Sequence, residues 1–139
     1  MASEKITIDA VIAAGQEKVW EYWTKPEHIR NWNFAADSWQ CPDARNDLRV
    51  SGTYFARMEA KDGSFGFDFE AVYDEVEENT KLTYTMGDGR QSTTTFEDQG
   101  NGLTKVTTVF DAESQNDPEM QKAGWQAILN NFKHYTEAN

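Results

Sequence analysis

The chain has 139 residues, with 13 basic and 24 acidic side chains and a formal net charge of -11. This length fits one domain over residues 1–139, and the acidic charge argues against nucleic acid or an anionic membrane as a partner, because both attract basic surfaces. The sequence has 8 Phe, 5 Trp and 5 Tyr, so large rings can build much of the interior. Such an interior is either a filled aromatic core or the wall of a ligand cavity.

The N-terminal part of the chain predicts one strand followed by two short helices. Residues 5–14 alternate apolar and polar side chains, as the residues of a half-buried strand do. Residues 16–23 carry apolar side chains at helical spacing. Thr24 and Glu27 then match a capping box, so we expect a second helix that ends near Trp32.

The middle of the chain predicts an antiparallel meander. The pairs Asp62-Gly63, Asp88-Gly89 and Asn101-Gly102 lie between alternating or β-branched residues, and such pairs supply the positive φ angles of tight hairpins. Residues 40–48, before the meander, are polar and are expected to form a loop. With the first strand we expect about six to seven antiparallel strands, five of them at residues 52–60, 65–76, 82–86, 91–97 and 103–112.

The last predicted element is a long helix that continues to about Tyr135. Asp117 is a favourable N-cap, and Pro118 occupies the first helical position, where its missing N–H costs nothing. Because the apolar face of a sheet must be covered, we expect this helix to pack across the sheet. Its apolar stripe is expected to consist of Trp125, Ile128, Phe132 and Tyr135, with Met120 and Leu129 at its edges.

Seven motifs, spread over most of the chain, resemble those of a known family. They are Val19-Trp20, Pro26 to Phe34, Gly63 to Glu70, Tyr84 to Arg90, Thr95 to Glu97, Phe110 to Glu113 and Gly124 to Lys133. In these motifs the chain is similar to the single-domain bacterial and archaeal members of the family named after the activator of the heat-shock-protein-ninety ATPase, within the START-like (SRPBCC) superfamily. The resemblance implies an α+β helix-grip fold, in which a curved antiparallel sheet wraps around a long C-terminal helix and two short helices follow the first strand.

The resemblance also implies a function. Proteins of this fold enclose a cavity between the sheet and the long helix, where they bind lipids, hormones, polyketides or other apolar molecules. We therefore expect a non-catalytic carrier or sensor of an apolar or aromatic small molecule. Two alternatives stay open: a cyclase- or hydrolase-like enzyme that uses the same cavity, and a module that binds a chaperone partner. The co-chaperone namesakes bind the chaperone through an additional N-terminal domain, which we expect this chain to lack.

Nine residues are the candidates for ligand contact. Phe65, Phe67 and Phe69 alternate along the predicted strand at residues 65–76. They either pack on the last helix or line a cavity together with methionines, whose flexible thioethers adapt to varied ligands. Trp32, at the end of the second predicted helix, and Phe34 are expected either to gate the cavity or to fill the core. The candidates are Trp32, Phe34, Met58, Phe67, Phe69, Tyr84, Met86, Trp125 and Ile128.

Tyr84 is the first candidate for a polar anchor in the cavity, because a buried tyrosine hydroxyl needs a partner. Arg57 is the second, although Glu59 or Asp68 can instead pair with it. The two histidines of the chain do not indicate a catalytic site. His28 and His134 belong to no nucleophile or metal-ligand pattern, so we expect no catalytic residue, no metal and no cofactor.

The cysteine count and the N-terminal sequence predict the compartment. Cys41 is the only cysteine, so it forms no internal disulfide, and we expect it to be a passive thiol. The segment from Met1 to Lys5 has no apolar stretch of the kind that starts a secretory signal. We therefore expect a cytoplasmic protein.

Overall fold

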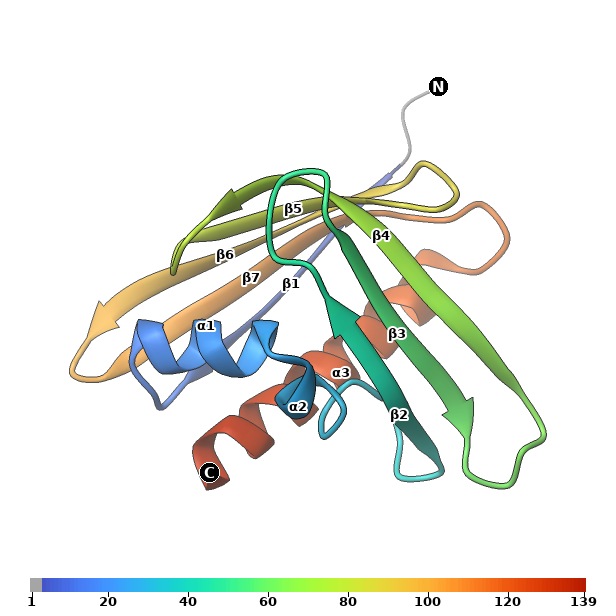
Figure 1. The fold of residues 1–139 in the computed structure, drawn as a ribbon, viewed down its shortest axis with the longest axis horizontal. Helices are drawn as coiled ribbons and strands as arrows, with labels where there is room; N and C mark the ends of the chain where they lie inside the picture. Colours follow the sequence, from blue (N-terminus) through green and yellow to red (C-terminus); the bar gives the residue numbers. More distant parts are fainter. Residues whose placement is uncertain (1–3) are drawn as a thin grey trace.

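The computed structural model describes residues 4–139, so the first three residues of the N-terminal segment discussed above lie outside the described part. A curled sheet carries one long helix along its concave side and two short helices at one end (Figure 1). The elements are β1 (Lys5–Ile12), α1 (Gln16–Thr24), α2 (Pro26–Ile29), β2 (Trp39–Asn46), β3 (Thr53–Ala60), β4 (Gly66–Glu77), β5 (Lys81–Met86), β6 (Gln91–Gly100), β7 (Leu103–Asp111) and α3 (Pro118–Ala138).

The described strands form one seven-stranded sheet in the order β1-β7-β6-β5-β4-β3-β2, and every neighbouring pair is antiparallel. Successive strands from β2 to β7 are neighbours, and the three Asx-Gly pairs lie in the hairpins β3–β4, β5–β6 and β6–β7. The first strand pairs with the last one, with Ile6 opposite Phe110 and Ile8 opposite Thr108. The α+β helix-grip fold and the expected number of strands are therefore confirmed.

The hairpin turns are formed by the predicted residues. Gly63 and Gly89 have φ angles of 79° and 92°, and Asn101 and Gly102 have φ angles of 56° and 75°. Positive φ angles are strained for most residues but accessible to glycine and asparagine, which is why Asx-Gly pairs predict these turns.

The expectation of a loop at residues 40–48 is wrong, because this segment contains the edge strand β2. Its pairing with β3 is interrupted by an irregularity between Gln40 and Asp43. The buried residues Cys41 and Ala44 are consequently three positions apart. A strand with such a bulge has no period of two, so the sequence pattern gave no strand signal.

The second helix is shorter than expected, and the capping box is not formed. Helix α2 ends at Ile29, and its N-cap is Lys25, without a side-chain cap. The hydroxyl of Thr24 instead donates to the carbonyl of Trp20 at 2.7 Å, because Thr24 is the last residue of α1. At α3 the expected cap is confirmed, since the carboxylate of Asp117 accepts a hydrogen bond from the backbone N–H of Glu119 at 2.8 Å.

Helix α3 packs mainly against β1 and is longer than expected, ending at Ala138. Leu129, which the pattern placed at the edge of the apolar stripe, is 1% exposed and lies at its centre beside the buried Phe132. Met120 is 60% exposed and lies outside the packed stripe. Because α3 packs mainly against β1, a space remains between this helix and the inner faces of β3 and β4.

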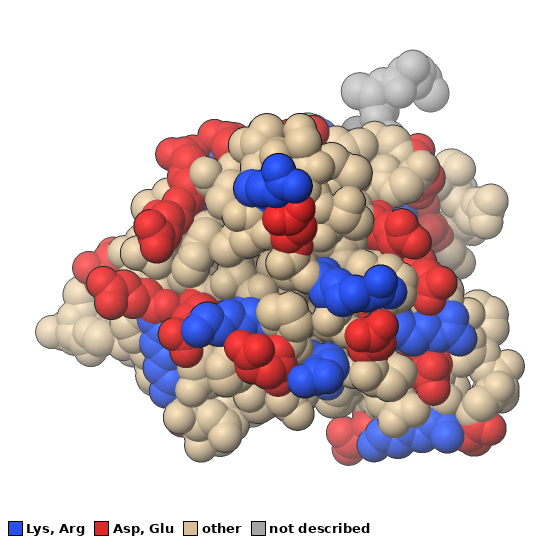
Figure 2. All heavy atoms as spheres, viewed as in Figure 1, with Lys and Arg blue, Asp and Glu red and all other residues tan. Residues whose placement is uncertain are grey.

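The charges on the surface are interspersed. On the face that carries α1, α2 and β2, Figure 2 shows acidic side chains next to the basic ones. Arg57, for example, binds Glu59 at 3.1 Å and Asp68 at 3.2 Å. Among residues 4–139, the structure contains no helix whose length and apolar character suit it to cross a membrane.

Candidate functional site

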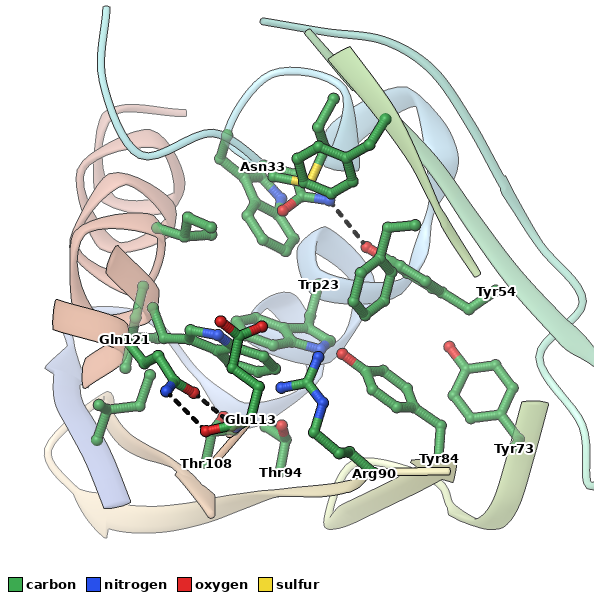
Figure 3. Close-up of a pocket in the computed structure, with 18 residues that line it drawn as sticks. Trp23, Asn33, Tyr54, Tyr73, Tyr84, Arg90, Thr94, Thr108, Glu113 and Gln121 are labelled. Carbon is green, nitrogen blue, oxygen red and sulfur yellow. Dashed lines mark hydrogen bonds between the residues drawn. The ribbon is translucent and has the colours of Figure 1, made fainter. Parts of the chain in front are cut away.

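A cavity of about 320 Å³ lies between the inner face of the sheet and α3 (Figure 3). Residues of β1, α1, β3 to β7 and α3 form its wall. The segments that follow α2, β5 and β7 complete it. It is lined by Ile8, Trp23, Trp32, Asn33, Tyr54, Met58, Phe67, Phe69, Tyr73, Tyr84, Arg90, Thr94, Thr108, Glu113, Gln121, Trp125, Ile128 and Leu129.

One wall of the cavity is an aromatic cluster on β3, β4 and β5. The ring of Tyr84 lies 5.8 Å from that of Tyr54, 5.9 Å from that of Phe69 and 6.1 Å from that of Tyr73. These residues alternate along their strands, so their side chains leave the sheet on the same face. The edge-to-face and offset contacts among the rings stabilise the wall and leave an aromatic surface toward the cavity.

The opposite wall is formed by α3, by Trp23 of α1 and by Trp32, which follows α2. Trp125 of α3 stacks on Phe110 of β7, with ring centroids 3.8 Å apart and an angle of 9° between the planes. Trp32 stacks on Trp23 at 4.9 Å and contacts Phe132 edge-on at 5.0 Å. The Trp32 indole N–H donates to the carbonyl of Tyr22 at 2.9 Å, which fixes this ring at the end of the cavity.

Seven of the nine candidate residues line the cavity: Trp32, Met58, Phe67, Phe69, Tyr84, Trp125 and Ile128. Phe34 instead borders a separate hollow of about 230 Å³ next to α3, where Asn130 and His134 also lie. Met86 is buried at the end of β5, opposite Ala71 of β4, and is not among the lining residues. Phe67 and Phe69 of β4 line the cavity, and Phe69 also packs against the core cluster that includes Leu129 and Phe132 of α3.

Exposed aromatic residues continue the cavity wall toward solvent. Phe67 is 42% exposed and Phe65 is 63% exposed at the turn between β3 and β4. Trp39 of β2 lies 5.8 Å from the ring of Phe65 and 6.2 Å from that of Phe67. We call Trp39, Phe65 and Phe67 the aromatic rim of the cavity. Clustered exposed rings of this kind are typical of binding surfaces.

The hydroxyl groups of the cavity wall are largely paired with protein groups. Asn33 donates to the hydroxyl of Tyr54 at 3.2 Å, and the hydroxyl of Tyr73 donates to Asn46 at 2.8 Å. On the floor of the cavity, the hydroxyls of Thr94 and Thr108 are 2.8 Å apart. These contacts give the hydroxyls of Tyr54, Tyr73, Thr94 and Thr108 a partner within the protein.

Tyr84, the expected polar anchor, lies deep in the wall. Burial raises the pKa of its hydroxyl to about 12, while Ser92 and Arg90 act in the opposite direction. The phenol is therefore neutral at pH 7 and can both donate and accept a hydrogen bond. Arg57 does not face the cavity, because its guanidinium binds Glu59 and Asp68 at the surface.

Two charged residues at one end of the cavity are absent from the sequence-based candidates. Arg90 follows the turn after β5, and Glu113 follows the end of β7. Figure 3 shows both side chains directed into the cavity, with Glu113 next to Gln121 of α3 and Arg90 on the side of Tyr84. Arg90 and Glu113 each end a motif that carries the family resemblance, but local periodicity does not place them in the cavity. They lie at the same end because β6 pairs with β7, with Ser92 opposite Phe110.

The histidines and the cysteine do not contribute to the cavity. His28 lies outside it, stacked on Tyr22 at 3.9 Å, and its Nδ1 is 2.7 Å from the hydroxyl of Tyr135. Cys41 is buried, and burial raises the pKa of its thiol to about 11. Within residues 4–139 no three His, Cys, Asp or Glu side chains are grouped so that they could hold a metal ion.

The fold and the internal cavity define an α+β helix-grip protein of the START-like class. The family model described as "Activator of Hsp90 ATPase homolog 1-like protein" matches residues 13–137, so the chain belongs to this family. None of the curated proteins matches the chain.

Solved structures agree with this assignment. The chain is 44% identical to an AHSA1-like protein from Aeromonas hydrophila, with a TM-score of 0.91, 97% of this chain covered and 93% of that one. It is 48% identical to a protein from Cytophaga hutchinsonii, with a TM-score of 0.83 and the same coverage, 97% and 93%. A protein from Chromobacterium violaceum, 22% identical with a TM-score of 0.87 and coverage of 98% and 99%, shares the fold.

Proposed function

We propose that this protein binds an apolar or aromatic small molecule in the cavity between the sheet and α3, as a non-catalytic carrier or sensor. The observation that carries the proposal is the cavity itself, whose volume of about 320 Å³ reaches the range of small-molecule sites. Its lining is mostly apolar and aromatic with a few polar groups, which is the composition of such sites.

The energetic driving force is the burial of apolar surface. A two-ring aromatic molecule that buries about 200 Å² gains about 5 kcal/mol at roughly 25 cal/mol per Å². The cost of association removes part of this gain. The cavity therefore favours ligands that are large enough to contact both Trp125 on one wall and Tyr84 on the other.

The aromatic rim supports a route of entry. Trp39 and Phe65 lie beyond the cavity on the same side as Phe67, which belongs to both the rim and the cavity wall. An apolar ligand that first contacts the exposed Phe65 ring can therefore reach the cavity along a continuous aromatic surface. This arrangement fits reversible uptake of a ligand from solution.

The test is the binding of a neutral apolar dye, N-phenyl-1-naphthylamine, to the purified full chain, followed by dye fluorescence. Wild-type protein is expected to bind the dye saturably. Ile128→Trp places a larger side chain in the cavity and is expected to weaken binding at least tenfold. Ala123→Trp adds the same ring to an exposed position of the same helix and is expected to bind like the wild type.

The outcomes separate a cavity ligand from unspecific adsorption. If wild-type protein does not bind the dye, or if Ile128→Trp binds it as well as Ala123→Trp does, the proposed function is wrong. Native mass spectrometry of the purified protein complements this test, because a small molecule that copurifies with the wild type and not with Ile128→Trp identifies the natural ligand.

A further inference from the structure

Arg90 has hydrogen-bonding capacity that the protein does not use. Its Nε donates to the carboxylate of Asp88 at 2.7 Å, and its Nη1 donates to the carbonyl of Asp111 at 3.3 Å. Within residues 4–139, Nη2 has no protein acceptor, although a guanidinium carries five N–H donors. Because the side chain lines the cavity, these free donors are available to a ligand there.

Glu113 faces the same end of the cavity and is held in place from α3. The side chain of Gln121 accepts from the backbone N–H of Glu113 at 2.8 Å and donates to its carbonyl at 3.2 Å, as the dashed lines in Figure 3 show. One carboxylate oxygen of Glu113 accepts from Asn116. The other oxygen has no donor within residues 4–139, and Glu113 forms no ion pair with Arg90 there.

The cavity end thus holds unused donors on one side and an unused acceptor on the other. Among the other polar groups of the wall, Thr94 and Thr108 bind each other and Tyr54 accepts from Asn33, while Tyr84 carries a neutral hydroxyl deeper in the wall. A ligand group is best matched to this end when it accepts from Arg90 and also donates to Glu113. A hydroxyl group does both.

We propose that the cavity selects apolar molecules that carry a hydroxyl head, an alcohol or a phenol, oriented toward Arg90 and Glu113. This inference rests on the proposed function and adds the chemical class of the ligand. An ether or ketone accepts from Arg90 but leaves the Glu113 carboxylate without a donor. A carboxylate accepts from Arg90 but faces the like charge of Glu113, which disfavours its binding.

The test compares three probes of one size: 2-naphthol, 2-methoxynaphthalene and 2-naphthoate, titrated into the full chain at pH 7 by calorimetry. We expect 2-naphthol to bind about tenfold more tightly than either of the other two, because a hydrogen bond to a charged group is worth about one order of magnitude or more. Arg90→Met is expected to reduce this preference to less than about threefold.

Two further variants separate recognition from loss of folding. Arg49 is an exposed arginine that, like Arg90, binds the aspartate two positions before it, but it lies outside the cavity. The Arg49→Met variant is therefore expected to keep the preference for 2-naphthol. Glu113→Gln removes the repulsive charge and is expected to strengthen 2-naphthoate binding about threefold or more, a gain that a misfolded variant cannot show.

The result that overturns the inference is equal binding of the three probes to the wild type, or an unchanged preference in Arg90→Met. Those results leave the proposed function intact, because the cavity still takes up apolar rings. If none of the three probes binds the wild type, the proposed function fails first and the inference fails with it.

Discussion

Trp125 of α3 lies flat on Phe110 of β7, with ring centroids 3.8 Å apart and planes that differ by 9°. This stack is one place where the long helix contacts the last strand through side chains, and it lies at the boundary of the cavity, which Trp125 lines and Phe110 does not. One face of the indole therefore packs on the core while the rest of the ring borders the cavity. Trp125 is consequently both a structural residue and a candidate for ligand contact.

This double role predicts a moderate loss of stability for Trp125→Ala. The variant loses the stacking contact but leaves a void that joins an existing cavity, so we expect a decrease in unfolding free energy of about 2 kcal/mol. Phe132→Ala, at a fully buried position of the same helix, is expected to cost about 3–5 kcal/mol. Urea denaturation measures both, and equal losses would mean that Trp125 is an ordinary core residue.

Gly124 predicts a gain of stability. It lies inside α3, and a Cβ atom built on it meets nothing within 4 Å. We expect Gly124→Ala to raise the unfolding free energy by about 0.5–1 kcal/mol, because alanine is the better helix former. Gly102→Ala serves as the comparison. The φ angle of Gly102 is 75°, which disfavours a residue with a side chain, so this substitution should lower the unfolding free energy. A destabilised Gly124→Ala would show that a neighbour needs this space.

Asp111 predicts a pH-dependent contribution to stability. A hydrogen bond from Lys5 and one from the backbone N–H of Gln91 at 3.0 Å lower the pKa of its carboxyl group. A lowered folded-state pKa stabilises the protein above the unfolded-state pKa of about 4, and the stabilisation is lost as the pH falls through the folded-state pKa.

The difference in unfolding free energy between wild type and Asp111→Asn should therefore be largest near neutral pH and should shrink below about pH 4. Urea denaturation over this pH range measures it. Asp37→Asn, at an exposed position, serves as the control with little effect at any pH. A difference for Asp111→Asn that stays constant with pH would contradict the assignment.

Cys41 predicts a thiol that is inert in the folded protein. Its side chain is 3% exposed, and burial together with nearby Asp43 raises the pKa of the thiol to about 11. Because the thiolate is the reactive form, Ellman's reagent at pH 8 should react slowly with native protein and rapidly after unfolding in guanidinium. Rapid reaction of the native protein would show that the β2 edge opens.

Much of the fold could be predicted because its turns and helix cap are local features. Asn101-Gly102 specifies the hairpin between β6 and β7, and Asp117 specifies the start of α3, each through contacts within a few residues. Strand β2 could not be predicted in this way. Pairing with β3 holds this strand, and the pairing is irregular between Gln40 and Asp43. Because of this irregularity, the residues of β2 do not alternate between apolar and polar.

The apolar part of the site followed from the same regular patterns, whereas its polar end did not. Tyr84 and Ile128 lie on a strand and a helix whose periodicity shows which face is inward. Arg90 and Glu113 lie in the segments next to strand ends, where no period applies, and the pairing of β6 with β7 places them at the same end of the cavity. Met86 was a candidate that does not line the cavity. It is two residues after Tyr84 on β5, so alternation predicts the same face of the sheet, but it lies at the end of the strand, beyond the cavity lining.

The five isoleucines of the chain allow the most direct test of the cavity as a ligand site. Ile8 and Ile128 line the cavity, whereas Ile6, Ile12 and Ile29 belong to the packed core outside its lining. The measurement is a titration of methyl-labelled protein with N-phenyl-1-naphthylamine, followed by the NMR shifts of the isoleucine methyl groups. The account predicts saturable shifts for Ile8 and Ile128 and small shifts for the other three. Shifts spread evenly over all five methyl groups, or no shifts at saturating dye, would contradict it.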